Sequence, residues 1–484
     1  MEIKEIKNYV NGEWYEGSGA EIIDVENPAT GEILANFRTS TPDDVKEAVN
    51  AAKNAFKEWR RVPAVERCRY MFKFYNLLKE NWEDIAKTLT MEHGKEYPAA
   101  YGEMKRAIEM VEVACGIPSL MKGEFSEDIA RGIDEYLIRV PLGVFAMIPP
   151  FNFPAMLPLW FIPWAVACGN TYIIKPAREV PITMNKIFEQ ADKAGFPKGV
   201  VNLVSSGRGV IDELLENKDI VGISSVTSTP TAKAIYRRAS ENGKRVHCGA
   251  GANNFLIVMP DANLDKVIPN MIGSCFGNTG QRCLAGSIIL GVGDIYEELK
   301  EKLVKAASNL KVGYALEKGI DMGPVISKKA LDHLHKDIEI CIKEGVNLIL
   351  DGRGVKVEKY PKGYYLGPTI FENAKSGSHI FEEEVFGPVV CIKKVKNFDE
   401  AIELANSSKF GNAATIYTEN GRWAREFQSK IECGNVGINV GIVAPMSFYP
   451  FAGMKDSFFG DLHPQAEDVI NFFTDRKVVI SRWW

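Results

Sequence analysis

The feature that most constrains the fold is an alternation of short apolar runs, rich in β-branched residues, with helix-like segments. The first block of apolar runs lies at residues 142–148, 171–176, 200–206 and 220–226, with helix-like segments at 181–194 and 230–242. A second block has apolar runs at 255–259, 287–292, 347–352 and 388–395 and a helix-like segment at 296–309. This alternation predicts mostly parallel sheets covered by helices on both faces.

The length and charge of the chain narrow the class of protein. The 484 residues, 46% of them hydrophobic, are enough for two or three domains. A net charge of −5 argues against a nucleic-acid or anionic-membrane surface, because both need clustered Lys and Arg. The most apolar stretch, residues 140–167, contains six prolines and is not expected to cross a membrane.

The pattern of cysteines and the N-terminal sequence both bear on the cellular compartment. The nine cysteines are dispersed, with no CxxC pair and no compact Cys/His cluster, so neither a disulfide framework nor a metal site is expected. Residues 1–14 lack the apolar core of a secretory signal. A reducing cytoplasm fits these features best.

Two further segments can be assigned. Residues 41–60 predict an amphipathic helix capped by Thr41, and residues 64–92 are expected to continue as helix. The C-terminal KVVISRWW (477–484) reads as a lone apolar strand. An exposed edge of this kind is an aggregation hazard, so we expect it to pair with another element or another subunit.

The most informative candidate for chemistry is Cys283, which follows a glycine-bearing turn and precedes an apolar strand. Such a turn can direct backbone N–H groups at a thiolate, lower its pKa and form an oxyanion pocket, and Arg282 adds positive charge. The competing interpretation is a buried structural cysteine.

Three other motifs carry candidate residues. Asn152 lies between proline-fixed turns, where a rigid amide can donate to an oxyanion, and Lys175 ends a strand, where doubly wound sheets bind ligands. Glu384 could accept ribose hydroxyls, and Phe386 could press on a nicotinamide ring. Taken singly, each motif also fits a purely structural role.

Together, PFNFP, KPA, GQRC and EEVFGP, in this order and spacing, resemble the aldehyde dehydrogenase superfamily. The resemblance covers essentially the whole chain, from NGEW (11–14) and NPATGE (27–32) to the tail. It implies an α/β fold with a Rossmann-type cofactor domain, an α/β catalytic domain and a small β oligomerisation element. The implied boundaries are 1–124 and 141–248, then 249–445, then 125–140 and 460–484. A homodimer or homotetramer follows from the same resemblance.

The resemblance also assigns roles. Cys283 becomes the nucleophile toward a small-molecule aldehyde, and Asn152 and the N–H of Cys283 become the oxyanion donors. The cofactor, NAD or NADP, would be bound by Ile148, Pro150, Phe151, Lys175, Ala177, Arg178, Ser228, Glu384 and Phe386.

One departure from the superfamily pattern points to a branch. Gly249 stands where most hydrolytic members carry the glutamate that activates the deacylating water. This absence, together with Arg106, Arg282 and SFFGDLH (457–463), resembles methylmalonate-semialdehyde dehydrogenases, which pass the acyl group to coenzyme A (CoA). In that branch the two arginines bind the substrate carboxylate, which suits their forked guanidinium groups.

Two more departures concern the cofactor. Thr227 and Ala232 replace glycines near the phosphate-binding turn, so a close backbone approach to a pyrophosphate is less favoured there. Arg178 stands where relatives that prefer NAD often carry glutamate. We therefore hypothesise that NADP is accepted, and the sequence leaves open which cofactor is preferred.

The leading hypothesis is oxidation of a small acidic semialdehyde with acyl transfer to CoA. A second hypothesis is a hydrolysing dehydrogenase of glyceraldehyde or lactaldehyde, in which His247 or a water held by Glu384 replaces the missing base. A third is a catalytically silent member that uses the fold for binding or structure. The aldehyde, the acyl acceptor and the oligomeric state are left open by the sequence.

Overall fold

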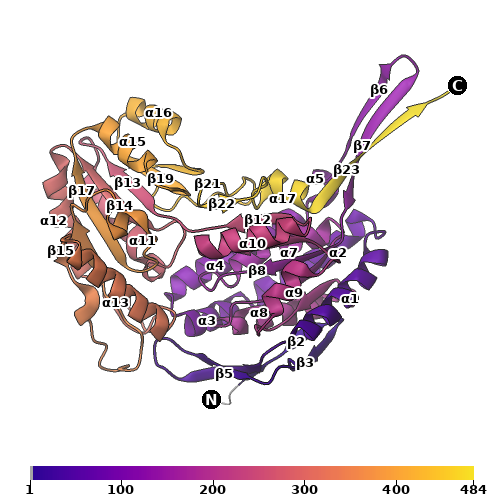
Figure 1. The fold of residues 1–484 in the computed structure, drawn as a ribbon, viewed down its shortest axis with the longest axis horizontal. Helices are drawn as coiled ribbons and strands as arrows, with labels where there is room; N and C mark the ends of the chain where they lie inside the picture. The colour runs from indigo at the N-terminus through magenta and orange to yellow at the C-terminus, as the bar shows by residue number, and fades with distance from the viewer. Residues whose placement is uncertain (1–3) are drawn as a thin grey trace.

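A computed structural model describes residues 4–484, so the first three residues of the predicted segment 1–124 lie outside the described part (Figure 1). Its larger sheet has the strand order β22-β12-β11-β8-β9-β10-β2-β3. The five central strands are parallel: β8 (Val144–Ile148), β9 (Thr171–Ile174), β10 (Val201–Leu203), β11 (Ile220–Val226) and β12 (Arg245–Gly249). The antiparallel edges are β22 (Phe458–Phe459), β2 (Asn8–Val10) and β3 (Glu13–Tyr15).

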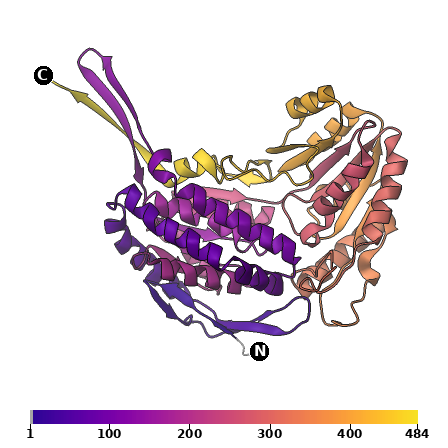
Figure 2. The same cartoon turned by 180° about the vertical axis from the view of Figure 1, so that it is seen from behind.

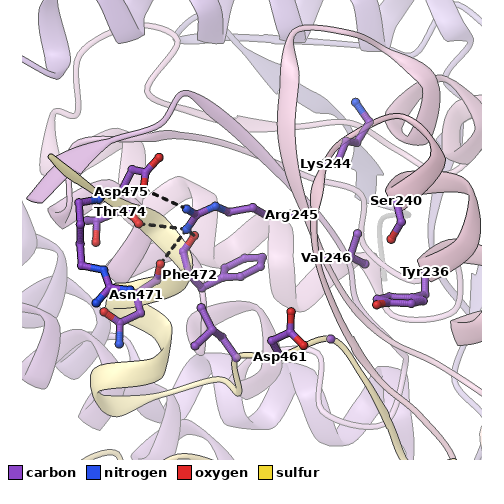
Figure 3. Close-up of a pocket in the computed structure, with 13 residues that line it drawn as sticks. Tyr236, Ser240, Lys244, Arg245, Val246, Asp461, Asn471, Phe472, Thr474 and Asp475 are labelled. Atoms are coloured by element: carbon purple, nitrogen blue, oxygen red, sulfur yellow. Dashed lines mark hydrogen bonds and ion pairs between the residues drawn. The ribbon is translucent and has the colours of Figure 1, made fainter.

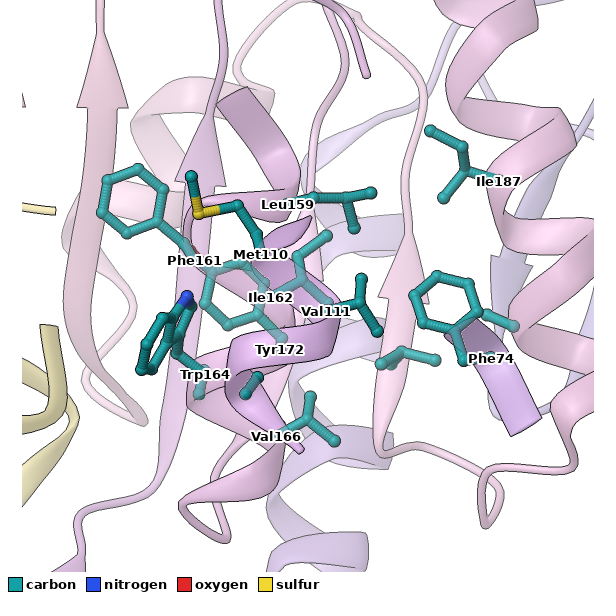
Figure 4. Close-up of a cluster of buried hydrophobic side chains, with 14 of the residues drawn as sticks. Phe74, Met110, Val111, Leu159, Phe161, Ile162, Trp164, Val166, Tyr172 and Ile187 are labelled. Carbon is teal, nitrogen blue, oxygen red and sulfur yellow. The ribbon is translucent and has the colours of Figure 1, made fainter. Parts of the chain in front are cut away.

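This sheet confirms all four predicted runs of the first block, because each is apolar enough to be buried on both faces. Alternate side chains face opposite layers, with Phe145 and Met147 in one core and Val144, Ala146 and Ile148 in the other. The first core packs against α2 (Ala64–Glu80), α4 (Tyr97–Ala114), α7 (Ile162–Ala167) and α8 (Pro181–Ala194) (Figure 4). The second packs against α1 (Pro42–Trp59), α9 (Val210–Glu216) and α10 (Thr229–Glu241).

The predicted helix over 64–92 is interrupted. Helix α2 ends at Glu80 and α3 runs over Trp82–His93. The amide of Asn81 donates to the carbonyl of Leu77 at 2.8 Å, and a side chain that bonds the preceding turn competes with the helix. By contrast, Thr41 precedes α1 as predicted, with its N–H bonded to Asp44 Oδ2 at 2.7 Å.

The second sheet has the order β15-β16-β17-β14-β13-β19-β20. Its parallel members are β16 (Thr369–Glu372), β17 (Val389–Val395), β14 (Gly286–Val292), β13 (Asn254–Val258), β19 (Ala413–Tyr417) and β20 (Asn435–Ile438). Strand β15 (Asn347–Leu350) is an antiparallel edge. Helices α11 (Leu264–Phe276) and α12 (Ile295–Ser308) contribute to one core, and α13 (Lys328–Lys343), α15 (Phe398–Asn406) and α16 (Gly421–Lys430) to the other.

The C-terminal strand pairs as expected, within a three-stranded arm that projects from the body of the molecule (Figures 1 and 2). Strand β23 (Thr474–Arg482) runs antiparallel to β7 (Ile133–Pro141), which pairs with β6 (Glu124–Ala130). The outer part of the arm exposes Phe125, Ile480 and both terminal tryptophans.

Arg245 fixes the base of the arm. Its guanidinium donates to the carbonyl oxygens of Asn471, Phe472 and Thr474 at 2.8, 3.1 and 3.0 Å, where α17 (Ala466–Phe473) gives way to β23 (Figure 3). These groups line a cavity of about 480 Å³, and none of the predicted catalytic or cofactor residues borders it. Between residues 4 and 484, no helix is both long enough and apolar enough to cross a membrane.

Candidate active site

A cleft of about 970 Å³ opens at the carboxyl ends of the strands of the larger sheet, facing the second sheet's domain. Doubly wound sheets bind ligands at this position. The cleft brings together every predicted catalytic and cofactor-binding residue: Ile148, Pro150, Phe151, Asn152, Lys175, Ala177, Arg178, Ser228, Cys283, Glu384 and Phe386. Arg106 and Arg282 lie outside its lining.

The turn before Cys283 is held in an uncommon backbone conformation. Asn278, Thr279 and Gly280 all have positive φ angles, of 55°, 54° and 70°. A Cβ on Gly280 would lie 2.0 Å from the carbonyl oxygen of Gly387, so only glycine fits there. Side-chain bonds keep the turn in place, from Thr279 Oγ1 to the Gly323 carbonyl and from the Ile326 N–H to Gln281 Oε1, both at 3.1 Å. Such strain persists only where the surrounding structure enforces it.

Cys283 is anchored through its own backbone. Its carbonyl oxygen accepts from Asn254 Nδ2 at 2.8 Å and from Asn412 Nδ2 at 2.6 Å. The N–H groups of Cys283 and Leu284 and the charge of Arg282 lower the pKa of its thiol, as expected. Burial is the larger effect, however, and the pKa rises to about 12, so the predicted net lowering is wrong.

Asn152 is fixed to the same loop. Its side chain is 4% exposed, and its Nδ2 donates to the Gln281 carbonyl at 3.1 Å, two residues before Cys283. The amide is thus held beside the sulfur-bearing turn, where a developing oxyanion would lie.

Sequence reasoning missed a buried ion pair beneath Asn152. Lys95 Nζ donates to Glu103 Oε2 and to the Asn152 carbonyl, both at 2.6 Å, and both side chains are fully buried. Glu103 Oε1 accepts the N–H groups of Ala155 and Met156 at 2.9 and 3.1 Å. The pair therefore holds both sides of the Asn152 turn. A single Lys or Glu in the sequence gives no signal of this, because such residues are usually solvated.

The far end of the cleft carries three basic side chains and the carboxylate of Glu179. Lys175 is 9% exposed and donates to Ser206 Oγ at 3.2 Å, and burial lowers the pKa of its amine to about 8. Arg178 is exposed at the rim, and Arg208, which sequence reasoning missed, lines the same wall. Ser228 precedes α10, so the N-terminus of that helix also borders the cleft, where it can meet a phosphate.

Gly249 ends β12 beside a second, smaller cavity of about 20 Å³ that Cys283 also lines. His247 lies at the wall of this cavity, between the rings of Phe161 and Phe458, with centroids 4.9 and 5.1 Å from its own. Burial lowers the pKa of His247 to about 3, so it is neutral and weakly basic at pH 7.

Glu384 and Phe386 reach the cleft from the second sheet's domain. Glu384 Oε1 accepts the Ala252 N–H at 3.0 Å, and burial raises the pKa of its carboxyl to about 8. The ring of Phe386 meets that of Phe151 edge-on, with centroids 5.9 Å apart.

The two predicted carboxylate-binding arginines have protein partners. Arg106 donates to the carbonyl oxygens of Ala444 and Pro445 at 3.2 and 2.9 Å and to Glu109 at 2.9 Å. Arg282, which directly precedes Cys283, is partly exposed and donates to the Gly273 carbonyl at 3.1 Å. The structure does not bring the two guanidinium groups into the main cleft.

Over residues 4–484, no cluster of His, Cys, Asp or Glu side chains could hold a metal ion, and all nine cysteines are free.

Comparison with known proteins gives a consistent result. The family model for the aldehyde dehydrogenase family matches residues 14–479. The chain is 46% identical over 481 residues to malonate-semialdehyde dehydrogenase 2 of Geobacillus thermodenitrificans (strain NG80-2), covering 99% of each chain. A protein assigned as a methylmalonate-semialdehyde dehydrogenase from Sinorhizobium meliloti 1021, solved with NAD, superposes with a TM-score of 0.97 at 38% identity, over 99% of this chain and 98% of that one. The methylmalonate-semialdehyde dehydrogenase of Oceanimonas doudoroffii gives the same TM-score and identity, over 99% of each chain.

Proposed function

The chain belongs to the aldehyde dehydrogenase family, and we propose that it oxidises a small acidic semialdehyde, of the malonate or methylmalonate type, and transfers the acyl group to CoA. The observation that carries this proposal is that Cys283 and Asn152 line one cleft. Strand β12 ends beside Cys283 in Gly249, where a hydrolytic enzyme would carry its glutamate. The relatives named above act on such semialdehydes by their descriptions.

In the first half-reaction the Cys283 thiolate adds to the aldehyde carbon. The Asn152 amide and the Cys283 N–H then stabilise the alkoxide. Collapse of the alkoxide expels a hydride and leaves a thioester on Cys283. A bound nicotinamide supplies the acceptor for that hydride. Because the free thiol has a raised pKa, the reactive thiolate must form only when another group takes its proton.

The residues of the cleft fit a dinucleotide cofactor. Its volume is in the range of a large ligand site, and the α10 N-terminus and Lys175 offer donors to phosphate and ribose groups. Glu384 would accept ribose hydroxyls, and Phe386 would support the nicotinamide ring.

We propose that NADP is accepted beside NAD, because Arg178 and Arg208 lie together at the far end of the cleft. Replacing Arg178 with Glu should lower kcat/KM for NADP and spare NAD. The proposal would be contradicted if wild type and Arg178→Glu had the same kcat/KM for NAD and neither was active with NADP.

The absence of a carboxylate side chain at Gly249 bears on whether water or a thiol accepts the acyl group. No carboxylate projects from this position toward Cys283, and the nearby His247 is too weakly basic at a pKa of about 3 to activate water well. A thiol is a better nucleophile than water and needs less activation. These points favour CoA over hydrolysis.

Arg282 and Arg106 are proposed to bind the substrate carboxylate. For Arg106 this requires exchanging its bonds to the 444–446 loop for the carboxylate, since both terminal nitrogens already have protein partners. Their replacement by Met should raise KM for an acidic semialdehyde more than for an uncharged aldehyde.

The arm supports a homo-oligomer. It buries little of its apolar surface within one chain, and β20, the edge of the second sheet, exposes Ile438. Unpaired strands and exposed apolar side chains of this kind are typical of subunit contacts. Deletion of residues 477–484 should make the protein elute as a monomer or as an aggregate in size-exclusion chromatography. An unchanged oligomer would argue against this assignment.

The decisive experiment mixes the protein with malonate or methylmalonate semialdehyde and NAD or NADP, with and without CoA. Acyl-CoA detected by mass spectrometry is the expected product. Free acid formed at the same rate without CoA would overturn the acyl-transfer proposal, and no stoichiometric burst of reduced cofactor would indicate a silent protein.

A further inference from the structure

The turn that follows Gly249 holds a carboxylate that comes from another part of the chain. Asn253 Nδ2 donates to the carbonyl oxygens of Ile380, Phe381 and Glu383, at 3.0, 3.0 and 3.3 Å. These bonds tie the segment that carries Glu384 to the turn.

The Glu384 carboxylate itself is docked on this turn, through its bond to the Ala252 N–H. A Cβ on Gly251 would lie 2.8 Å from Glu384 Oε2, so the glycine leaves the space that the carboxylate fills. The strand therefore delivers no acidic side chain at Gly249, yet a carboxylate lies next to Gly251, two residues further along the chain.

This carboxylate acts electrostatically on the reactive sulfur. Glu384 and Cys283 line the same cleft, and the charge of Glu384 is the strongest electrostatic influence on the Cys283 thiol after burial. Glu179, at the other end of the cleft, acts instead on Lys175.

Transfer to a thiol needs a base. An alkyl thiol with a pKa of about 8.5 is mostly protonated at pH 7, and only its thiolate attacks a thioester readily. The base best suited to this proton has a pKa close to that of the thiol. Glu384, at about 8, meets this condition, whereas His247, at about 3, does not.

We propose that Glu384 is the base that takes the proton from the thiol of the acyl acceptor, an inference that rests on the proposed transfer to CoA. In the ionised form of Glu384, which is the minority form at pH 7, the carboxylate takes the S–H proton while the sulfur attacks the thioester carbon. The bond between that carbon and the Cys283 sulfur then breaks, and the departing thiolate takes the proton from Glu384. Nothing is oxidised or reduced, and Glu384 ends in the state in which it began.

Glu384 would act as a base at a later stage of the reaction than its expected contact with the ribose. Glu384 would meet ribose hydroxyls during aldehyde oxidation and the acceptor thiol afterwards, when the cleft is open to CoA.

The test separates deacylation from cofactor binding. Full-length protein without nicotinamide is acylated on Cys283 with p-nitrophenyl acetate, excess ester is removed, and release of the acetyl group is followed after adding CoA at pH 7. Glu384→Gln should form acetyl-CoA at least about 100-fold more slowly than wild type, the lower range of a general-base contribution. Thiophenol, which is already ionised at pH 7, should release the acetyl group equally fast from both proteins.

Glu383→Gln is the matched control, since its exposed carboxylate pairs with Lys409 at 2.8 Å away from the cleft, and it should behave as wild type. Equal acetyl-CoA formation by Glu384→Gln and wild type, or an equal defect with thiophenol, would overturn the role of Glu384 alone. If CoA releases the acetyl group from wild type no faster than buffer does, the proposed transfer to CoA fails instead.

Discussion

Placing a glutamate at Gly249 should convert the protein into a hydrolase of its own thioester. The position accepts a side chain, because Gly249 does not have a positive φ and the heavy atoms nearest to an added Cβ would be those of Val226, at 3.3 Å or more. Beyond it lies the cavity of about 20 Å³ that Cys283 borders. This cavity can hold a single water, so the new carboxylate and its water would have to share space with the main cleft.

The expected gain follows from the chemistry of the missing base. General-base catalysis contributes roughly 10²–10⁴-fold. The neighbouring Glu384 shows how strongly burial acts here, since its pKa rises to about 8. A buried glutamate introduced in place of Gly249 would then be mostly protonated at pH 7, which favours the lower part of that range and a rate that increases toward pH 8.

The assay is steady-state formation of free acid from the semialdehyde without CoA. Gly249→Gln is the control, because it has nearly the same size and no basic carboxylate. The reasoning is refuted if Gly249→Glu keeps the burst of reduced cofactor but forms free acid no faster than Gly249→Gln.

Three further predictions concern the oxyanion site, the buried ion pair and pH. Asn152→Ala should lower kcat by about 10²–10³-fold, or roughly 3–4 kcal/mol. Lys95→Met should lower the free energy of unfolding by about 3–5 kcal/mol, because it leaves Glu103 buried and unpaired, and urea denaturation measures this loss. If Lys95 acts on catalysis through Asn152, adding Lys95→Met to Asn152→Ala should change kcat little; a full additive loss would refute that coupling. The folded pKa of Glu384 is raised from 4.5 to about 8, so its contribution to stability is complete below pH 4.5 and is lost as pH rises through 8. The unfolding free energy of wild type, relative to Glu384→Gln, should therefore fall across that interval, and a constant difference would contradict it.

The sequence predicted several strands that are buried on both faces, such as β8, β13 and β14, because a continuous apolar run is visible without any partner. The buried strands β16 and β19 were not among its predictions. It also missed β12, whose residues Arg245, Val246 and His247 alternate in polarity and whose place in the sheet depends on β11 and β22. The residues named as catalytic or cofactor-binding all came together in one cleft, since each belongs to a recognisable motif.

What the sequence could not provide were effects that depend on distance in space. The net pKa of the Cys283 thiol is a balance between nearby donors and burial, and only the folded structure sets the larger one. The pair of Lys95 and Glu103 likewise acts on a turn about fifty residues away.

The arm of β6, β7 and β23 shares no residue with the cleft around Cys283. If subunits join through it, a copy with a damaged cleft would still be recruited into assemblies as readily as an intact one. In a cell that makes both, at least half of the assemblies would be mixed when the two copies are made in equal amounts, and activity would follow the proportion of intact copies. Damage to the arm would act in the opposite way, because such a copy would be excluded from assemblies and leave the intact ones unaffected.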